Sequence, residues 1–352
     1  MPSEPHVSVC IRAHTRAEGL RSAIASVLTQ TYGDFELVVS DDSGSLEGVV
    51  TGFGDPRVRY HRNTAPAGPA ANLANAVSLA RGRLIAILND DDYWLAGFLA
   101  AAVDAFDTEP DVGLVFSDDF FEIGDRRVRR RLPFAPGRHD SFLRPLLEHS
   151  MPPSAAVMRR AVWEEGERAV PLSPRMVGDA VVWLRSASAG WPFYYIAEPL
   201  AVCRVHVGQI SWSEERLPSL LIAAYDEFRF DDPDCEDLRR ARVAEFLVAR
   251  ARVHLMRRRF RLAWADIALA HRTSPRPLGL RAVLALSGVR GAVIRWGCRR
   301  PRALVAVLEV WRRLRPPVLP RGAGGGSPAP HRRAAAATPS RAWSASASRA
   351  DP

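Results

Sequence analysis

The sequence predicts an α/β protein with a mostly parallel sheet, helices on both of its faces, and a helical C-terminal extension. Short apolar runs without turn residues, at 7–11, 35–40, 84–88 and 112–116, are typical of buried strands. Between these runs, apolar residues recur at helical spacing, as in residues 20–28. Strands and helices that alternate in this way form a parallel sheet covered on both faces.

The remaining elements follow in chain order. We expect the first helix to begin at the capping-box pattern of residues 15–18, and the second at Gly68-Pro69, because proline suits the first turn of a helix. Further strands are expected at 58–61, 151–158 and 193–197, and further helices at 95–106 and 179–189. The polar, arginine-rich segment 125–138 is expected to be a mobile loop.

Composition and charge divide the chain into three regions. Residues 1–213 hold the α/β pattern, residues 214–315 have helical patterns, and residues 316–352 are rich in Pro, Ala, Gly, Ser and Arg. Because the last composition cannot bury a core, we expect a disordered tail. The net charge is +9, and all 48 basic residues are arginine. Residues 250–315 hold 17 arginines and 2 acids, whereas residues 1–249 hold 26 arginines and 36 acids.

Cysteine spacing and hydropathy narrow the class of protein. The four cysteines form no C-x-x-C pair, which argues against a zinc site and suits a reducing compartment. No window approaches the length of about 18 uninterrupted apolar residues that marks a transmembrane helix. The N-terminus lacks the basic and then apolar pattern of a signal peptide. We therefore expect a cytoplasmic protein.

Acidic residues follow two of the expected strands. Asp41 and Asp42 come directly after residues 35–40, and three aspartates at 90–92 follow residues 84–88. Ligands of open α/β sheets bind beyond the carboxyl ends of the strands, so both clusters indicate a binding site. Aspartate is also common in turns, so an ordinary acidic turn is the alternative for each cluster.

Five motifs occur in a fixed order along the first 212 residues. They are VSVCIRAHTR at 7–16, SVLTQTY and FELVVSDDS within 26–43, LNDDDYW at 88–94, Gly178-Asp179, and Glu198-Pro199-Leu200 leading into Arg204-Val205-His206. Together they resemble the family 2 glycosyltransferases of the GT-A (Rossmann-like) fold. The resemblance spans residues 5–212, and it is specific because five motifs share the family's order and spacing.

The resemblance implies that the first two strand ends bind the nucleotide of a sugar donor. Asp42 would contact the base, Asp41 would support the loop, and Arg12, Ala13 and Asp90 would line the same pocket. The chemistry fits, because a carboxylate accepts hydrogen bonds from a base N–H or from ribose hydroxyls. A pair of turn aspartates is the alternative.

The resemblance also implies a divalent cation, Mn²⁺ or Mg²⁺, held by Asp91 and Asp92 together with His206. Such a cation stabilises the negative charge on a departing nucleoside diphosphate, and hard cations prefer oxygen ligands. Three adjacent aspartates also repel one another unless a cation lies among them. Asn89 stands where many relatives carry aspartate, which weakens the cation site. The alternative is a solvated acidic turn.

By the same resemblance, Asp179 is the general base that takes the proton of the acceptor hydroxyl, in a direct displacement that inverts the sugar. Gly178 replaces the glutamate usual in the family, so the base loses a neighbour. The alternative role of Asp179 is a helix N-cap. Arg204 and Trp183 would reach the diphosphate or the acceptor, although core packing is the alternative for Trp183.

These assignments predict an inverting glycosyltransferase that moves a sugar from a nucleotide-diphosphate sugar, here a UDP-sugar, to an acceptor hydroxyl. The acceptor would be a glycan, a lipid-linked molecule or a small molecule, in cell-surface polysaccharide or glycoconjugate synthesis. Asn89 and Gly178 favour one alternative, a non-catalytic homologue that binds sugar nucleotides. The other alternative, a nucleotidyltransferase, needs a glycine-rich basic loop, and residues 12–16 contain no glycine.

The basic regions suggest further partners. Helices after residue 240 carry arginine beside Leu, Val, Ala and Trp, as in residues 255–270. Basic amphipathic helices bind anionic membranes, so the protein would sit peripherally on the inner face of the plasma membrane. The alternative is that these helices pack on the acidic domain. No nucleic-acid module is recognisable, so no nucleic-acid partner is expected. The arginines of 126–131 would hold a phosphate-bearing acceptor or would form a solvated loop.

Overall fold

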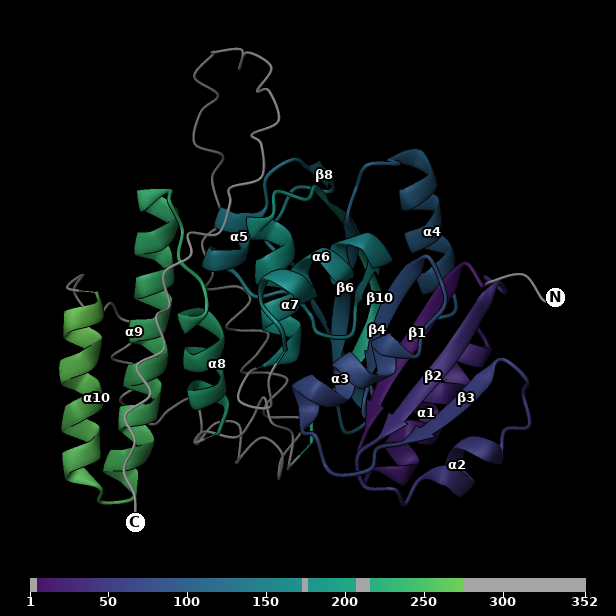
Figure 1. Cartoon of the computed structure of the whole chain (residues 1–352), viewed down its shortest axis with the longest axis horizontal. Coiled ribbons are helices and arrows are strands. Elements are labelled where there is room, and N and C mark those ends of the chain that lie inside the picture. The colour runs from purple at the N-terminus through teal and green to yellow at the C-terminus, as the bar shows by residue number, and fades with distance from the viewer. Residues whose placement is uncertain (1–4, 173–176, 207–215, 275–352) are drawn as a thin grey trace, which may run out of the picture. The chain divides into compact units, whose positions relative to one another are not determined.

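A sheet of ten strands organises the part of the chain that the structure, a computed structural model, describes: residues 5–172, 177–206 and 216–274 (Figure 1). The strand order is β3-β2-β1-β4-β9-β6-β10-β5, with β7 paired to β6 and β8 paired to β10. The bounds are β1 Val7–Ala13, β2 Phe35–Asp41, β3 Val58–Arg62, β4 Leu84–Asn89, β5 Tyr93–Trp94, β6 Leu114–Ile123, β7 Arg126–Arg130, β8 Gly137–His139, β9 Ala156–Arg159 and β10 Phe193–Arg204.

Strands β3, β2, β1 and β4 pair in parallel, and β6 pairs in parallel with β10. In their register Ala13 lies opposite Asp41, and Arg12 lies opposite Asn89. Strand β1 is buried along almost all of its length, as its apolar sequence predicts. The expected α/β fold is confirmed, and the register brings the carboxyl ends of these strands to one edge of the sheet.

Antiparallel strands complete the sheet. Strand β9 pairs antiparallel with β4 and β6, β5 and β8 with β10, and β7 with β6. The expectation of a mobile loop at 125–138 is wrong, because this segment contains β7 and the start of β8. Arg129 binds Asp118 and Arg130 binds Asp119 across the β6–β7 pair. These ion pairs explain why an arginine-rich run folds as a strand.

Helices cover both faces of the sheet, and alternate strand residues explain how. Cys10 and Ile85 belong to one core cluster, whereas Val9 and Leu84 belong to the other. The second cluster includes residues of α1, α2 and α4, and the first includes residues of α3, α5, α6 and α7. The bounds are α1 Ala17–Leu28, α2 Glu47–Thr51, α3 Pro69–Ser78, α4 Phe98–Thr108, α5 Leu143–Glu148, α6 Arg160–Ala169 and α7 Gly178–Ser188.

Two helix starts test the sequence patterns. Helix α3 begins at Pro69 after Gly68, as predicted. The capping box predicted at residues 15–18 is wrong, because the N-cap of α1 is Arg16 and no side chain caps the helix. The guanidinium of Arg16 instead binds Asp90 and Asp91, so this end of α1 is fixed by the acidic loop.

Three further helices follow β10: α8 (Arg216–Asp226), α9 (Pro233–Met256) and α10 (Phe260–Thr273). The Asp232 carboxylate caps α9, and Pro233 occupies its first turn. Leu247 and Val248 of α9 belong to the same core cluster as Phe193 of the sheet. The helical extension is thus observed as far as residue 274, and the predicted tail at 316–352 lies outside the described residues. None of the described helices combines the length and hydropathy needed to span a membrane.

Candidate active site

The loops after β1, β2 and β4 are joined by hydrogen bonds from backbone N–H groups. The Asp42 N–H donates to the Ala13 carbonyl over 3.0 Å. The His14 N–H donates to the Asp90 carboxylate over 3.1 Å. The two acidic clusters predicted from the sequence therefore lie on adjacent loops at one edge of the sheet.

Asp41 organises the loop after β2. Its carboxylate is fully buried and accepts hydrogen bonds from Ser43, from the Leu46 N–H at 2.9 Å and from the Tyr60 hydroxyl at 3.0 Å. Burial raises the pKa of this carboxyl, but these hydrogen bonds together hold it below its usual range. The geometry fits a residue that supports the loop.

Asp42 anchors the segment that leads into α3. Its carboxylate accepts hydrogen bonds from the Asn63 side chain (2.8 Å), the Ala67 N–H (2.9 Å) and the Gly68 N–H (2.8 Å). An ionised carboxylate offers about four lone-pair positions. These three hydrogen bonds leave one position free to accept a hydrogen bond from a ligand. A contact with a nucleotide base stays a prediction.

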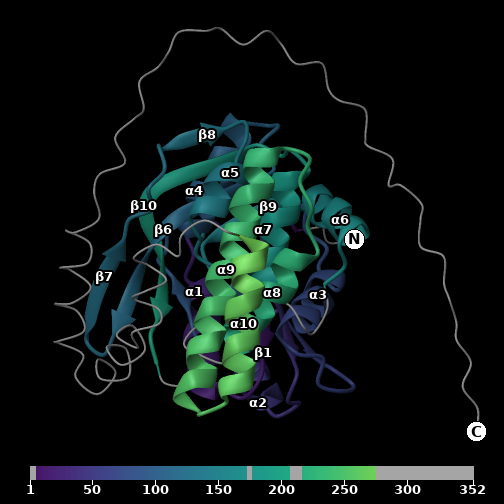
Figure 2. The ribbon, with the colours of Figure 1, turned by 90° about the vertical axis from the view of Figure 1, so that its left-hand side faces the viewer.

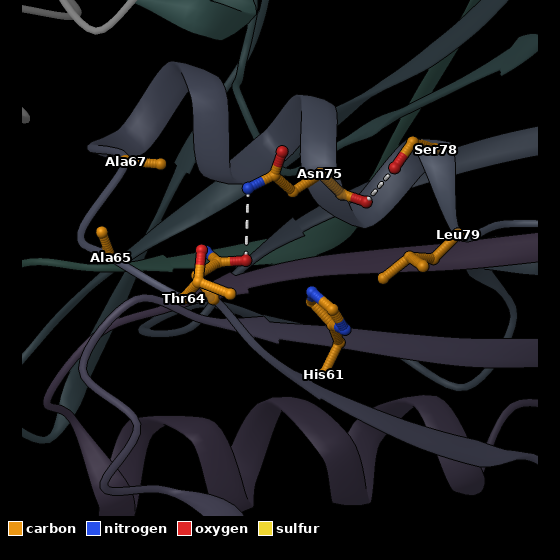
Figure 3. Close-up of a pocket in the computed structure, with 8 residues that line it drawn as sticks. His61, Thr64, Ala65, Ala67, Asn75, Ser78 and Leu79 are labelled. Carbon is orange, nitrogen blue, oxygen red and sulfur yellow. Dashed lines mark hydrogen bonds between the residues drawn. The ribbon is translucent and has the colours of Figure 1, made fainter.

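A cavity of about 280 Å³ lies beside this anchored segment (Figure 3). Asn63 and Ala67, which both donate to Asp42, line it, together with His61 of β3 and Asn75 of α3. No acidic residue and no arginine is among its lining residues. None of the site residues predicted from the sequence lines this cavity.

The three aspartates after β4 have different surroundings. Asp90 and Asp91 both bind the Arg16 guanidinium, at 3.2 and 3.1 Å. Asp91 also lies 3.0 Å from the His206 ring nitrogen Nε2. Asp92 accepts hydrogen bonds from the Ser154 hydroxyl, the Asn89 amide and the Arg204 N–H. A loop with three carboxylates is thus stabilised by the adjacent Asn89 and by three other segments, which contribute Arg16, Ser154 and residues 204–206.

Burial separates the acidities of these carboxyls. Burial and the neighbouring Asp91 charge raise the pKa of Asp92 to about 7, and they raise the pKa of Asp90 too. Burial would also raise the pKa of Asp91, but the His206 hydrogen bond and the Arg16 charge outweigh it and lower that pKa. Of the three carboxyls, Asp91 is therefore the one that most favours the ionised form, which a cation requires.

The pair of Asp91 and His206 suits two neighbouring positions of a metal ion. Two adjacent ligands of an octahedral ion, each about 2.1 Å from it, lie about 3.0 Å apart. The distance between Asp91 Oδ2 and His206 Nε2 is 3.0 Å. Within the described part of the chain, no group of three His, Cys, Asp or Glu side chains forms a metal site. Asp92 is 1% exposed, so its position favours support of the loop over direct coordination.

Asp179 lies in the first turn of α7, next to the ends of β1 and β4. Arg12 connects them, because its Nη2 donates to the Asn89 side chain over 2.7 Å and lies 3.9 Å from Asp179 Oδ2. The other terminal nitrogen of Arg12 is buried and has no hydrogen-bond partner among the described residues. The N-cap alternative for Asp179 is wrong, because the N-cap of α7 is Val177.

Close packing against Ala70 explains why a glycine occupies position 178. A Cβ atom at this position would lie 3.1 Å from the Ala70 Cα and 3.3 Å from its Cβ. The glycine therefore lets the start of α7 approach the first turn of α3. The departure from the family's usual glutamate leaves Asp179 in place beside Arg12.

Arg204 and Trp183, predicted at the diphosphate or the acceptor, lie in contrasting surroundings. The Arg204 guanidinium lies 4.6 Å from the ring centre of Tyr93 and binds Glu122. Arg127 of β7 binds the same glutamate. Trp183 is 3% exposed and belongs to the hydrophobic core, which supports the packing alternative for it.

The sequence reasoning did not assign site roles to Arg16, Asn63 or Ser154. Arg16 lies in the first of the five motifs, so its position could have suggested a role. Asn63 and Ser154 are single polar residues without a motif of their own. They reach Asp42 and Asp92 only through contacts between distant segments.

The fold is that of the GT-A type glycosyltransferases. Residues 8–166 of the chain match the model of glycosyl transferase family 2.

Curated relatives agree with the family. The chain is 36% identical over 95 residues to the Escherichia coli UDP-Glc:alpha-D-GlcNAc-diphosphoundecaprenol beta-1,3-glucosyltransferase WfgD, across 26% of this chain and 38% of the relative. It is 28% identical over 213 residues to an uncharacterized glycosyltransferase of Nostoc, across 57% of this chain and 65% of the relative. The chain spans about two fifths of the length of WfgD and of the similar E. coli enzyme WfaP.

Solved structures share the fold. S. aureus TarS in complex with UDP-GlcNAc has a TM-score of 0.61 at 14% identity, with 87% of this chain and 91% of that one covered. A mannosyltransferase of Pyrobaculum calidifontis, in complex with GDP-Man and Mn²⁺, has a TM-score of 0.54 at 18% identity, with 89% of each chain covered. At these identities the likeness concerns the fold.

Proposed function

We propose that this protein is an inverting glycosyltransferase that moves a sugar from a nucleotide-diphosphate sugar to an acceptor hydroxyl, in the synthesis of a cell-surface polysaccharide or glycoconjugate. One observation carries the proposal. Arg12 joins Asn89 at the end of β4 to Asp179 on α7, and the aspartate loop follows Asn89 directly. The residue proposed as the general base therefore lies at the same end of the sheet as the carboxylates proposed to bind the cation. That cation would stabilise the leaving diphosphate.

A UDP-sugar is the donor that we propose. The relatives WfgD and WfaP are named as UDP-Glc-dependent enzymes, and TarS is seen with UDP-GlcNAc. In this chain Asp42 would contact the base through its remaining lone pair, while Arg12, Ala13, Asp41 and Asp90 shape the loops around the nucleotide. The mannosyltransferase complex with GDP-Man makes a GDP-sugar the first other donor to test.

Asp91 and His206 would hold Mn²⁺ or Mg²⁺ together with oxygens of the donor diphosphate. A bound divalent cation would stabilise the charge of the leaving diphosphate. Arg16 lies 3.1 Å from Asp91 Oδ2 and supplies positive charge to the same loop. It would have to release Asp91 in part when a cation binds, because both contact the same oxygen.

Asp179 would take the proton of the acceptor hydroxyl as that oxygen attacks the anomeric carbon. Its Oδ1 accepts a hydrogen bond from the Ala180 N–H, while Oδ2 lies toward Arg12. The first turn of a helix favours a carboxylate, because the backbone N–H groups there point at it. Asn89 and Gly178 leave both Asp91 and Asp179 in place, which supports catalysis over the non-catalytic alternative.

A lipid-linked acceptor with a diphosphate is the acceptor class that we propose. WfgD and WfaP are named for diphosphoundecaprenol-linked acceptors. Arg127 and Arg204 both bind Glu122 beside Tyr93, so two guanidinium groups lie close together there. Guanidinium groups bind phosphate oxygens through charge-assisted hydrogen bonds, which suits an acceptor of this class.

The purified full chain tests the proposal with UDP-glucose, UDP-GlcNAc and GDP-mannose, each with and without Mn²⁺ and a diphosphoundecaprenol-linked GlcNAc acceptor. We expect release of nucleoside diphosphate from one donor, dependent on both the acceptor and the cation. Donor binding without any release, across the whole panel, would favour the non-catalytic alternative.

A further inference from the structure

The large exposed hydrophobic side chains of the described residues lie together at one place. All six large hydrophobic residues that are classed as exposed lie at the end of α9 or on α10. They are Leu255, Met256, Phe260, Leu262, Trp264 and Leu269. Trp264 is 69% exposed and Phe260 is 58% exposed. Scattered single exposed residues are ordinary, but such a concentration marks an interaction surface.

The geometry of α10 explains the exposure. Its buried residues, Ala263, Asp266 and Ala270, lie three or four positions apart and pack toward α9. Figures 1 and 2 show α10 alongside α9, and in Figure 1 α9 lies between α10 and α8. Phe260 and Trp264 are also four positions apart, so they share one side of the uncovered face.

The same surface is cationic. Residues 257–259 of the turn are all arginine, and Arg261 and Arg272 are exposed on α10. The one acid between residues 255 and 274 is Asp266, which is buried and holds the Arg250 guanidinium at 2.7 and 2.9 Å. Within that span, no exposed carboxylate therefore offsets the charge of Arg258, Arg261 or Arg272.

The turn keeps an arginine where the backbone favours glycine. Arg258 has a φ of 56° and is the only described residue other than glycine with a positive φ. Glycine or asparagine usually occupies this position after a helix, because a Cβ atom is unfavourable there. An arginine that is kept here despite its unfavourable backbone conformation is consistent with a requirement for positive charge at the turn.

We propose that this surface, residues 255–272 of the α9–α10 hairpin, docks the protein on an anionic lipid bilayer. Exposed Trp, Phe and Leu side chains enter the boundary between headgroups and acyl chains, while arginines contact anionic headgroups. The inference goes beyond the proposed reaction, because it rests on the hairpin alone and requires no particular donor.

Three other partners of this surface fit it less well than an anionic bilayer does. Residues 275–315, which follow α10 in the chain, hold ten arginines and one acid, so they carry the same sign as the surface. A second copy would bring the same cationic surface to the contact. A nucleic acid would suit the arginines but would leave the four aliphatic side chains without a partner of their own chemistry.

Co-sedimentation of the full-length protein with vesicles tests the proposal. The vesicles are phosphatidylcholine alone or a mixture with phosphatidylglycerol. We expect binding to the anionic vesicles, weakened by high salt. The double variant Arg261→Gln/Arg272→Gln should bind about 30-fold more weakly, since each arginine contributes about 1 kcal/mol near such a surface. Phe260→Ser/Trp264→Ser should also lose binding, about 10-fold or more.

A matched control separates surface charge in general from this surface. Arg83 and Arg168 are exposed and lie outside the hairpin, so Arg83→Gln/Arg168→Gln should bind vesicles as the unchanged protein does. All variants should keep the melting temperature and the nucleotide-sugar affinity, measured without vesicles. That second measurement tests the proposed reaction independently of membrane docking.

Four outcomes would overturn the proposal. They are equal binding to neutral and anionic vesicles, binding that the hairpin variants leave unchanged, an equal loss in the control variant, and dimers that dissociate in Phe260→Ser/Trp264→Ser while no vesicle binds. Tighter binding of RNA than of anionic vesicles, lost in the same variants, would assign the surface to nucleic acid.

Discussion

Asn89 is the residue at which the aspartate loop departs from the family that it resembles, and its contacts give a structural reason for the asparagine. Its side-chain oxygen accepts from Arg12, and its side-chain nitrogen donates to Asp92 over 3.1 Å. An aspartate in its place would keep the first contact and would turn the second into a repulsion between carboxylates. The amide thus lets the loop hold Asp92 inside the protein.

Asn89→Asp should therefore destabilise the protein at pH 8. A buried acceptor that loses its donor costs about 1–3 kcal/mol in the free energy of unfolding. The loss should be smaller at pH 5, because the pKa of Asp92 is about 7 and its protonated form can donate to the new carboxylate. Urea denaturation at the two pH values measures this difference. An equal loss at both values would contradict the assigned contact.

Glu236 gives a second pH prediction, which starts from a lowered pKa instead of a raised one. Hydrogen bonds from Arg239 and Arg240 lower its pKa to about 2. An acid with a lowered folded-state pKa stabilises the fold above its unfolded pKa, and this contribution is lost as the pH falls from about 4.5 to about 2. Glu236→Gln should cost about 1–3 kcal/mol in unfolding free energy at pH 7 and little near pH 2. Denaturant titrations across this range test it, and a cost independent of pH would contradict it.

At the residue scale, the sequence predicts best where a motif fixes the position. The adjacency of Asp91 and His206 follows from motifs that lie 115 residues apart in the chain. Ser154 could not be predicted in this way, because nothing in its neighbourhood marks a partner for Asp92. For Trp183 the nearby motif was misleading, because this residue follows Gly178-Asp179 in the sequence but belongs to the hydrophobic core.

At the scale of elements, the start of α1 and the aspartate loop depend on each other. A Cβ atom on Gly19 would lie 2.5 Å from the Asp90 carbonyl oxygen and 3.3 Å from the Asp91 Cα. Both are backbone atoms, so no side-chain rotation could relieve the clash. Only glycine lets α1 approach the loop this closely.

Gly19→Ala should displace the loop. We expect a cost of about 1–3 kcal/mol in unfolding free energy and weaker binding of Mn²⁺ and of the donor. Gly48→Ala in α2 is the matched control, because a Cβ there meets no atom within 4 Å and alanine suits a helix better than glycine. Thermal melting and donor titration of both variants provide the measurement. Unchanged binding in Gly19→Ala would show that the loop position does not govern the site.

The elements themselves could be predicted to different extents. The parallel strands followed from apolar runs such as residues 7–11, because a strand that is buried on both faces has no polar alternation. Strand β7 could not be predicted, since its arginines resemble a solvated segment until Asp118 and Asp119 are known to face them. Strand pairing between distant residues decides such cases.

At the scale of the whole molecule, the proposed site and the cationic surface lie in parts of the chain with opposite net charge. The predominantly acidic α/β part of the chain carries the proposed site, and the arginine-rich residues begin within α9. The core cluster that includes Phe193 of the sheet also includes Leu247 of α9. The helical hairpin is thus attached to the α/β fold, and its exposed surface is available to place the enzyme at a membrane.

The role of Asp179 is the central claim, and Asp179→Asn tests it most directly. The measurement is the rate of nucleoside diphosphate release in the presence of the accepted donor, acceptor and cation, compared with Asp104→Asn, an exposed aspartate of α4, as the control. Loss of a general base should lower kcat about 100- to 10,000-fold while donor affinity stays unchanged. A rate for Asp179→Asn within a few-fold of the control would contradict the account.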